Sequence, residues 1–456
     1  MKKTSNIWIR FINITGISVL IIELVLSIFV SFFLKDIINL RLKAQIKETF
    51  GDFYTLSYEI SYTSLSWNGF DIEFEKVDFK TDTSNRYMML RYPAIFFKTN
   101  LFQITDMDVT DFFFKSIVDV NNVSIDQPKL QFYIPEKADS SFKTETDYQE
   151  KQKSTIDSKR VGKFKLSRGR ASVVFKKNLK DTLYAIKKVN MEMTDLKIGL
   201  NSTEIIIKTS RVSQVAFSLS DIQLSPSNSE YRFKIEGMLF DYQANLWQAY
   251  GIEVTPKGDP YQMAKDTEFR KTIFTVKMDS FLYQSAHFED LKDLKMLKGN
   301  ALHLIGLDMN LVRNKSVPLD ESKYKKLFHQ SLLDVNFPVE IDSIYIKNSS
   351  IDYKLYSNKE QSPGNLMLTK LDATMNNLYN TTLEERTVTA SFKGQFMEAA
   401  PFTFEAKMPL LDPTNHSYQG YIGSMDLVSL SPLIANLTRV KLTEGRINSI
   451  YFNGKA

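Results

Sequence analysis

Apolar and polar residues alternate along most of the chain after residue 55, as they do in β-strands with one apolar face and one polar face. The stretch 337–379 shows this pattern most clearly, with apolar residues at every second position and turn-forming residues at 348–350. Polar residues around Pro363–Gly364 separate it from two further alternating runs. We therefore predict a meander of short strands here. Its alternating apolar residues before Pro363 are Ile344, Ile346, Ile351, Tyr353 and Leu355.

The same arrangement recurs elsewhere in the chain. Residues 161–200 repeat the order of strand, short turn, strand, polar loop, strand and strand, with Ser167–Arg170 at the turn. A partial third copy covers residues 440–452, with Gly445 at its turn. Recurrence of one strand unit favours a stacked β architecture.

Two other places predict how strands are joined or interrupted. Alternation in 72–74 and 77–79 changes phase at Glu75–Lys76, which predicts a β-bulge. Alternating runs on either side of Gln127–Pro128 predict a hairpin. The polar stretch 136–159 predicts a loop.

Helical periodicity is rare. Residues 319–335 carry apolar residues at near-helical spacing, and so do residues 425–437, although Pro432 interrupts them. Residues 36–52 predict a short amphipathic helix whose apolar stripe includes Ile37 and Leu40. So few helices cannot cover the apolar face of a long sheet.

The N-terminus carries one long apolar run. Phe11–Leu34 is 24 residues long, and at about 1.5 Å per residue it is long enough to cross a bilayer. No small-residue cleavage site follows it, so we predict an uncleaved membrane anchor. Basic residues lie on both sides of the run, so charge does not settle its orientation. We assign six residues of this run to the predicted anchor: Ile17, Leu20, Glu23, Leu24, Ile28 and Phe32.

Glu23 lies in the middle of this run, where a carboxylate is costly. Two interpretations are open: Glu23 marks the contact with a partner helix, or it is protonated or tolerated in a single anchor.

These patterns predict a mostly β protein: an N-terminal transmembrane helix, then an elongated, curled antiparallel β-sheet that forms a groove, with a few short helices. The expected parts are an anchor at 1–35, the connecting helix at 36–52 and one repetitive β-body at 53–456, whose end in a strand-like run fits a body that continues past Ala456. An apolar face that neither helices nor a second sheet cover is expected to line the groove. The predicted lipid-facing residues are Ile72, Phe74, Val123, Ile125, Leu130, Phe132, Ile134, Val173, Phe175, Met191, Met193, Ile344, Ile346, Ile351 and Tyr353.

Composition and motifs predict no enzyme. The net charge of +5 is spread along the chain without an Arg-rich stripe, which argues against nucleic-acid binding. Cysteine is absent, which excludes disulfides, thiolate metal sites and cysteine nucleophiles. Phosphate-binding loops and zinc-protease motifs are also absent. The four histidines lack metal-ligand spacing, so we expect no catalytic residue, cofactor or metal; they are His287, His303, His329 and His416.

The anchor, the repeats I-D-S-I-Y-I-K-N-S-S-I-D-Y and P-G-N-L-M-L-T-K-L-D-A-T-M-N-N-L within 341–378, and D-L-V-S-L-S-P-L-I with L-T-E-G-R-I-N-S-I-Y-F at 426–452 together suggest a family. The chain resembles the AsmA-like proteins of Gram-negative envelopes, relatives of TamB and of the bridge-like lipid-transfer proteins. The resemblance covers most of the chain after residue 55 and implies no catalytic residue. It implies a single-pass inner-membrane protein with a periplasmic β-groove, implicated in moving phospholipid to the outer membrane.

Two function classes follow. In the first, the groove binds or conducts the acyl chains of phospholipid or another lipid, because each CH₂ group buried on an apolar face gains about 0.8 kcal/mol. In the second, the β-body is a membrane-tethered scaffold for other envelope proteins and carries no lipid. A scaffold would fill the apolar face with side chains and helices, whereas a lipid conduit would leave it open.

Overall fold

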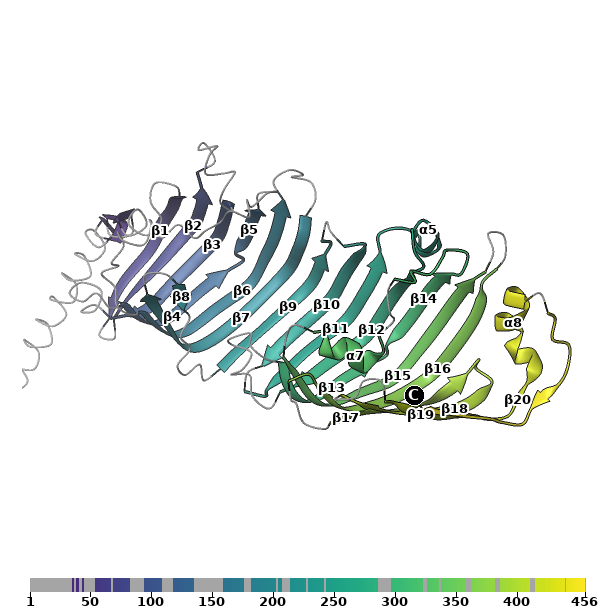
Figure 1. Ribbon diagram of the computed structural model, residues 1–456. Coiled ribbons are helices and arrows are strands. Elements are labelled where there is room, and N and C mark those ends of the chain that lie inside the picture. The colour runs from purple at the N-terminus through teal and green to yellow at the C-terminus, as the bar shows by residue number, and fades with distance from the viewer. Residues whose placement is uncertain are drawn as a thin grey trace, which may run out of the picture. The chain divides into compact units, whose positions relative to one another are not determined.

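The protein is mostly β, as the alternation predicts, with a few short helices (Figure 1). Contacts within the chain divide it into two units, Met1–Phe217 and Ser218–Ala456, which we describe separately as unit 1 and unit 2. The computed structural model describes residues 35–36, 38–40, 43–44, 54–66, 69–82, 94–108, 118–134, 159–175, 182–201, 204–206, 214–226, 229–241, 243–285, 297–322, 326–335, 338–357, 362–381, 386–410, 415–438 and 440–455.

Unit 1 is a layer of long strands. They lie in the order β1, β2, β3, then β4 and β5 in line, β6, β7 and β8. Their bounds are β1 Tyr54–Ser66, β2 Gly69–Thr81, β3 Ala94–Met107, β4 Val118–Asp126, β5 Lys129–Ile134, β6 Lys159–Phe175, β7 Thr182–Asn201 and β8 Glu204–Ile206. The strand β9, Gln214–Leu224, spans the boundary between the units.

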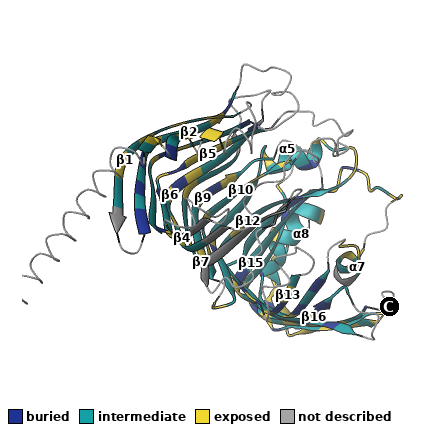
Figure 2. Cartoon of the chain, turned by 90° about the vertical axis from the view of Figure 1, so that its left-hand side faces the viewer, coloured by how far each residue is buried: buried dark blue, intermediate teal, exposed yellow. Residues whose placement is uncertain are grey.

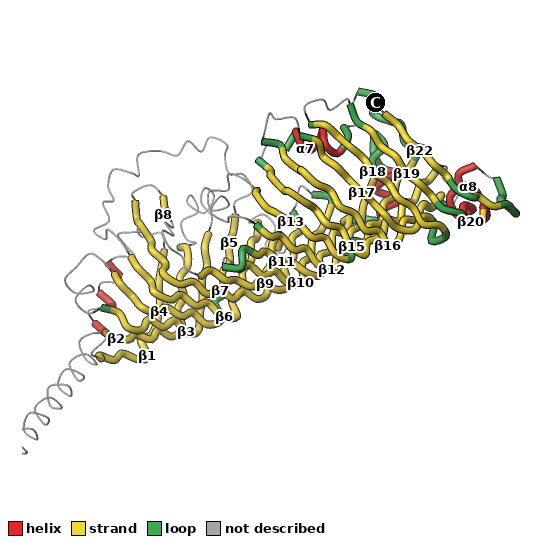
Figure 3. Tube along the Cα trace, turned by 90° about the horizontal axis from the view of Figure 1, so that it is seen from below, coloured by secondary structure: helices red, strands yellow, loops and turns green. Residues whose placement is uncertain are grey.

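Unit 2 is also built of paired strands, with short helices at its margins (Figure 3). Its strands are β10 Tyr231–Asp241, β11 Leu246–Pro256, β12 Thr272–Gln284, β13 Leu297–Ile305, β14 Asp308–Asn314, β15 Val339–Tyr356, β16 Gly364–Tyr379, β17 Thr387–Phe396, β18 Ala400–Pro409, β19 Ser417–Ile422, β20 Met425–Asp426, β21 Arg446–Ile447 and β22 Ile450–Lys455. The helices among its described residues are α5 Pro260–Lys265, α7 Phe328–Leu333, the 3₁₀ helix η4 Leu427–Leu430 and α8 Ser431–Thr438. The small pair β20–β21 lies apart from the main layer.

The predicted hairpin at Gln127–Pro128 is wrong. The strands β4 and β5 run in one direction as two halves of an interrupted strand, and both pair antiparallel with β3 and parallel with β6. Unit 2 repeats this arrangement, with β13 and β14 antiparallel to β12 and parallel to β15. The sheet is therefore mixed, which corrects the prediction of a purely antiparallel one.

The predicted turns at 167–170 and 348–350 are also wrong, because each lies inside one long strand. Arg168 in β6 and Asn348 in β15 adopt positive φ angles of 55° and 48°, and the pairing register shifts beside each of them. These are β-bulges, which bend a strand without ending it. The bulge predicted at Glu75–Lys76 is confirmed: Lys76 has a φ of 53° in the middle of β2.

The bulges occupy equivalent positions in the two units. In unit 1 the Gln127 N–H donates to the Ser167 carbonyl over 2.8 Å, and in unit 2 the Gly306 N–H donates to the Lys347 carbonyl over 2.9 Å. Just after each bulge, a second hydrogen bond reaches the interrupted strand. The Arg170 N–H donates to the Pro128 carbonyl over 2.7 Å, and the Ser350 N–H donates to the Leu307 carbonyl over 2.8 Å. The repeat seen in the sequence is thus a repeat of strand, interruption and bulge.

Gly306 gives a direct test of this geometry. Its φ is +64°, and an added Cβ would collide with the Asp279 side chain, whose Cβ would lie 2.9 Å away. We expect Gly306→Ala to lower the free energy of unfolding by about 1–2 kcal/mol, because an L-residue is strained in this conformation. Urea unfolding of the full chain measures the change.

Gly258→Ala is the matched control for that experiment. Gly258 lacks a left-handed φ, and its added Cβ would meet only the flexible Met263 side chain, with Sδ at 3.3 Å. Equal effects of the two substitutions would contradict the role assigned to Gly306.

The connecting segment at 36–52 is helical where it is described, at residues 36, 38–40 and 43–44. Ile38 is buried against the core of unit 1, whereas Leu40 is 72% exposed, so the predicted apolar stripe is displaced. The anchor predicted at Phe11–Leu34, with all of its selected residues, lies outside the described residues. None of the helices in the described part of the chain has the length and apolarity needed to cross a membrane.

The two helices predicted near the C-terminus are shorter than expected. Among the described residues of 319–335 only α7 is helical, and within 425–437 a short strand and η4 precede α8. Pro432 is the second residue of α8 and does not interrupt it. A proline in the first turn is tolerated because the N–H it lacks has no helical partner there.

Candidate functional site: an apolar face in each unit

Strand register gathers the apolar residues of unit 1 on one face. A single row of paired positions crosses five strands and contains only apolar side chains. Neighbouring residues point to opposite faces of a strand, so the alternation seen in the sequence becomes a continuous surface, the apolar face of unit 1. The row is Phe74, Phe102, Ile125, Leu166 and Met191.

The apolar positions stay on one face across each bulge because the bulge adds one residue between them, so their spacing is three residues there and two elsewhere. In β2 the apolar positions pass from Phe74 to Val77, and the equivalent step in β15 runs from Ile346 to Ser349. Beyond the bulge the period of two resumes on the same face. Residues from both halves of a strand therefore share one surface.

Register places the predicted lipid-facing residues of unit 1 with described side chains on this face. Val123 pairs with Phe164, which pairs with Met193, and Leu130 pairs with Ala171. The others on the face are Ile72, Phe74, Ile125, Phe132, Val173 and Met191. Ile134 pairs with Phe175 where β5 and β6 end, and the side chains of both lie outside the described residues.

One end of the apolar face in unit 1 is closed by protein. Ile72 and Phe74 are 2% and 5% exposed and belong to a core cluster with Ile38 and Phe70. Toward β5, β6 and β7 the side chains on this face are more exposed. The partly exposed residues there include Leu130, Phe132, Val173, Met191 and Met193.

Unit 2 has an apolar face built in the same way. One row of paired positions runs from β13 to β18 through Leu304, Ile346, Ala373, Phe392 and Phe404. The neighbouring predicted residues lie on the same face, because each pairs with an apolar residue of β16. Ile344 pairs with Met375, Ile351 with Leu368 and Tyr353 with Leu366, and all four predicted residues are partly exposed.

Two of the described helices, α7 and α8, pack on the margins of this face, and the residues in its middle are partly exposed. Leu332 of α7 packs on Val339, Ile341 and Leu378 at one margin. At the other, α8 lies so close to β16 that a Cβ on Gly364 would collide with Leu437. Figure 2 shows both helices on the inside of the bend formed by the strands of unit 2. The apolar face of unit 2 is thus concave, with helices at its margins.

An aromatic row extends this face to the last strand, and sequence reasoning missed it. Phe404 of β18 stacks with Tyr418 and Phe452 at ring-centroid distances of 6.2 and 6.4 Å. Phe392 lies 5.8 Å from Phe404 on the other side. Tyr418 and Phe452 are 39% and 37% exposed, which makes this the most open part of the face. Alternation in 387–396 and 400–409 is the signal in the sequence for Phe392 and Phe404.

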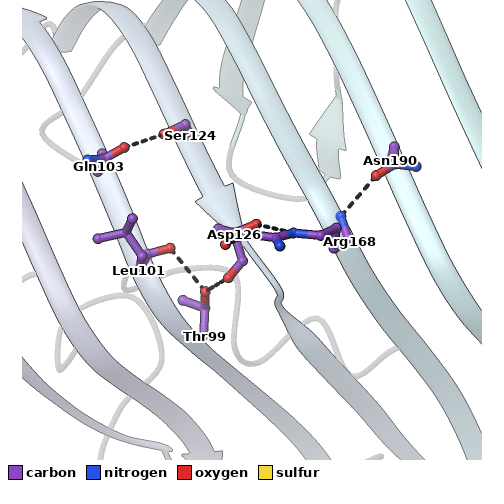
Figure 4. A network of polar contacts seen from close by, with 7 residues as sticks. All are labelled: Thr99, Leu101, Gln103, Ser124, Asp126, Arg168 and Asn190. Atoms are coloured by element: carbon purple, nitrogen blue, oxygen red, sulfur yellow. Dashed lines mark hydrogen bonds and ion pairs between the residues drawn. The ribbon is translucent and has the colours of Figure 1, made fainter.

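In unit 1 the face of the strands opposite the apolar face is polar, and hydrogen bonds between side chains link its neighbouring strands (Figure 4). Gln103 accepts a hydrogen bond from Ser124 over 3.0 Å and donates one to Glu73 over 2.8 Å. Arg168 pairs with Asp126 through two hydrogen bonds, and its own N–H donates to Asn190 over 2.9 Å. Hydrogen bonds and an ion pair thus satisfy polar side chains on one face of unit 1, whereas the other face of the same strands is apolar.

The Asn348 bulge has a polar partner on this second face. Its N–H donates to the Asp372 carboxylate over 3.1 Å, and Lys347 lies 3.4 Å from the same carboxylate. The Asn348 hydrogen bond, with a smaller contribution from Lys347, holds the pKa of Asp372 below its ordinary value. This contribution to stability is present above the unfolded pKa of about 4 and is lost as pH falls through the folded value.

The described residues contain no cluster of His, Asp or Glu side chains that could hold a metal ion. His303 stacks on Tyr345 at 5.0 Å on the polar face, which accounts for its position without a ligand. His287 and the His329 side chain lie outside the described residues.

No protein-family model, curated protein or solved structure matches this chain. The resemblance to the AsmA-like family therefore stays a prediction.

Proposed function

We propose that the apolar face of each unit binds the acyl chains of lipids and that the protein performs no chemical reaction on them. The observation that carries this proposal is the middle of the unit 2 face. There Ile344, Ile346 and Ile351 are partly exposed, while α7 and α8 cover only the margins. Large exposed apolar patches in proteins mark binding surfaces or drive aggregation.

The free energy gained by burying hydrocarbon on this face is large enough to bind a flexible hydrocarbon ligand. Each CH₂ group that leaves water for this face contributes about 0.8 kcal/mol, so a chain of some fifteen carbons could gain on the order of 10 kcal/mol before ordering costs. Met191 and Met193 on the unit 1 face add polarisable side chains that adapt to ligands of variable shape.

The cellular role in this proposal rests on the sequence. The apolar run at Phe11–Leu34 would anchor the protein in the inner membrane by a single span, with the bulk of the chain in the periplasm. Together with the AsmA-like resemblance, this favours a part in phospholipid transport to the outer membrane or in its lipid homeostasis.

A scaffold for envelope proteins is the second candidate function, and one observation favours it. Ile72 and Phe74, both predicted to face lipid, are buried with Ile38 in the core of unit 1. If protein covers the whole face in the same way, no lipid could bind there.

Site-specific photo-crosslinking in cells distinguishes the two functions. Crosslinkers at Phe132 and Ile346, on the apolar faces, are expected to capture phospholipid. Crosslinkers at the exposed Lys165 and Lys347 on the polar faces are the matched controls and should capture none. Mass spectrometry of the adducts identifies the lipid. Crosslinks from Phe132 and Ile346 only to this chain or to other proteins would support the scaffold.

A further inference from the structure

A group of basic side chains lies on the polar face of unit 1, apart from the bonds of Gln103 and Arg168. Lys129 of β5, Arg170 of β6 and Lys187 of β7 line one hollow with a volume of about 370 Å³. Lys129 and Arg170 are directly opposite each other in the parallel β5–β6 pair. All three residues are exposed.

These three cations have no acidic partner in the described part of the chain, because the neighbouring carboxylates are paired with other cations. Asp78 pairs with Lys98 at 3.0 Å and Glu192 with Lys163 at 2.9 Å. Asp126 pairs with Arg168. Like charges on adjacent strands repel each other, so this arrangement costs stability unless an anion neutralises it.

Unit 2 shows that the fold does not require the basic group. By the equivalence of the interrupted strands, Lys129 corresponds to Asp308 and Arg170 to Ser350. In unit 2 these two positions carry no positive charge and form a hydrogen bond, with Ser350 Oγ donating to Asp308 over 2.9 Å. The positive charge is therefore specific to the hollow in unit 1.

We propose that this hollow binds the phosphate group of an organic phosphate ester. The arginine presents a planar fork of donors that matches phosphate oxygens, and lysines add positive charge on both sides of it. Gln131 and Ser172, paired across β5 and β6, supply two more donors at the lining. Phe96 and Ala185 also line the hollow, from the same face as Gln131 and Ser172, so it has apolar surface for the carbon part of the ester.

The ester could belong to a lipid headgroup or to a soluble molecule, because the phosphate chemistry is shared. The site does not depend on acyl binding, since it lies on the opposite face of the strands from Phe132 and Val173. The three residues lie apart along the chain, at positions 129, 170 and 187, so the sequence alone shows no basic cluster.

Titration calorimetry of the full chain in an uncharged maltoside detergent tests the proposal with two probes. One probe is glycerol 3-phosphate, with glycerol as its uncharged control. The other is maltoside micelles that carry phosphatidylglycerol, compared with micelles that carry a diacylglycerol without phosphate. We expect at least one phosphate probe to bind, with an affinity that falls as salt is raised.

The variant pair Lys129→Gln/Arg170→Gln is expected to weaken that binding about tenfold or more, because charge-assisted hydrogen bonds to the phosphate are lost. Lys277→Gln/Lys407→Gln removes the same charge from exposed positions of unit 2 and should change affinity less than about twofold. Lys187→Gln alone should weaken binding by a smaller factor than the pair.

Binding of glycerol 3-phosphate would point to a soluble ester, and binding of phosphatidylglycerol alone to a lipid headgroup. The proposal is overturned if neither phosphate probe binds, or if the control pair weakens binding as much as Lys129→Gln/Arg170→Gln does. All of these residues are exposed, so folding is expected to be intact, and circular dichroism melting checks it.

Discussion

Replacing Phe70 with alanine is expected to lower the stability of unit 1 by about 3–5 kcal/mol. Phe70 is 1% exposed and packs in the cluster that joins Ile38 to the first strands. Its removal would leave a cavity in a close-packed core, and the surrounding strands could not collapse without breaking their pairing. Urea unfolding, followed by hydrogen exchange at the amides of β2 and β3, would measure and locate the loss.

Tyr62→Ala is the control for this experiment. Tyr62 lies on β1 beside the same core, is 54% exposed and pairs with Glu73 on the polar face. Its loss should cost less than about 1 kcal/mol. If Phe70→Ala leaves the exchange of β2 unchanged, then the cluster around Ile38 does not hold the first strands together.

The faces of the strands could be predicted from the sequence, whereas the joints between strands could not. Alternation depends only on neighbouring residues, and the structure places Ile344 and Ile346 on one face as expected. A hairpin turn and a bulge of this kind, however, use the same residues, because both place a residue at positive φ. Asn348 satisfies either, and only the partner strand β16, which pairs on both sides of it, decides for the bulge.

The error at Gln127–Pro128 has a related cause. A proline beside a residue that adopts a positive φ suits a hairpin, and locally nothing distinguishes it from an interruption. Here the chain continues straight because β3 pairs with both β4 and β5. One sign in the sequence would have helped: a step of three between apolar positions, such as Phe74 to Val77, marks a bulge within a strand.

The missed parts of the candidate sites come from several strands at once. Phe392, Phe404 and Phe452 meet through pairing across β17, β18, β19 and β22. Lys129 and Arg170 meet across a parallel pair whose connection is long. Such groups depend on register between distant segments, and alternation within one strand carries no information about it.

Ile346→Lys is expected to abolish lipid capture on the apolar face of unit 2. Ile346 is partly exposed in the middle of that face, between Leu304 and Ala373. A lysine there can extend its charged end toward water, so the fold should lose only about 1–3 kcal/mol. An acyl chain crossing the same position would have to desolvate an ammonium group, which is far more costly. A photo-crosslinker at Tyr353, on the same face, reports the loss of bound lipid.

Two controls separate this effect from general damage. Ile346→Leu keeps the apolar volume and should leave capture at Tyr353 unchanged. Lys347→Gln alters the neighbouring residue on the polar face, where it removes only a half-exposed ion pair with Asp372, and it too should leave capture unchanged. Hydrogen exchange of β15 and β16 confirms that the strands remain paired in each variant. If Ile346→Lys keeps full capture at Tyr353 while those strands stay protected, the lipid does not lie along this face, and the scaffold becomes the better account of unit 2.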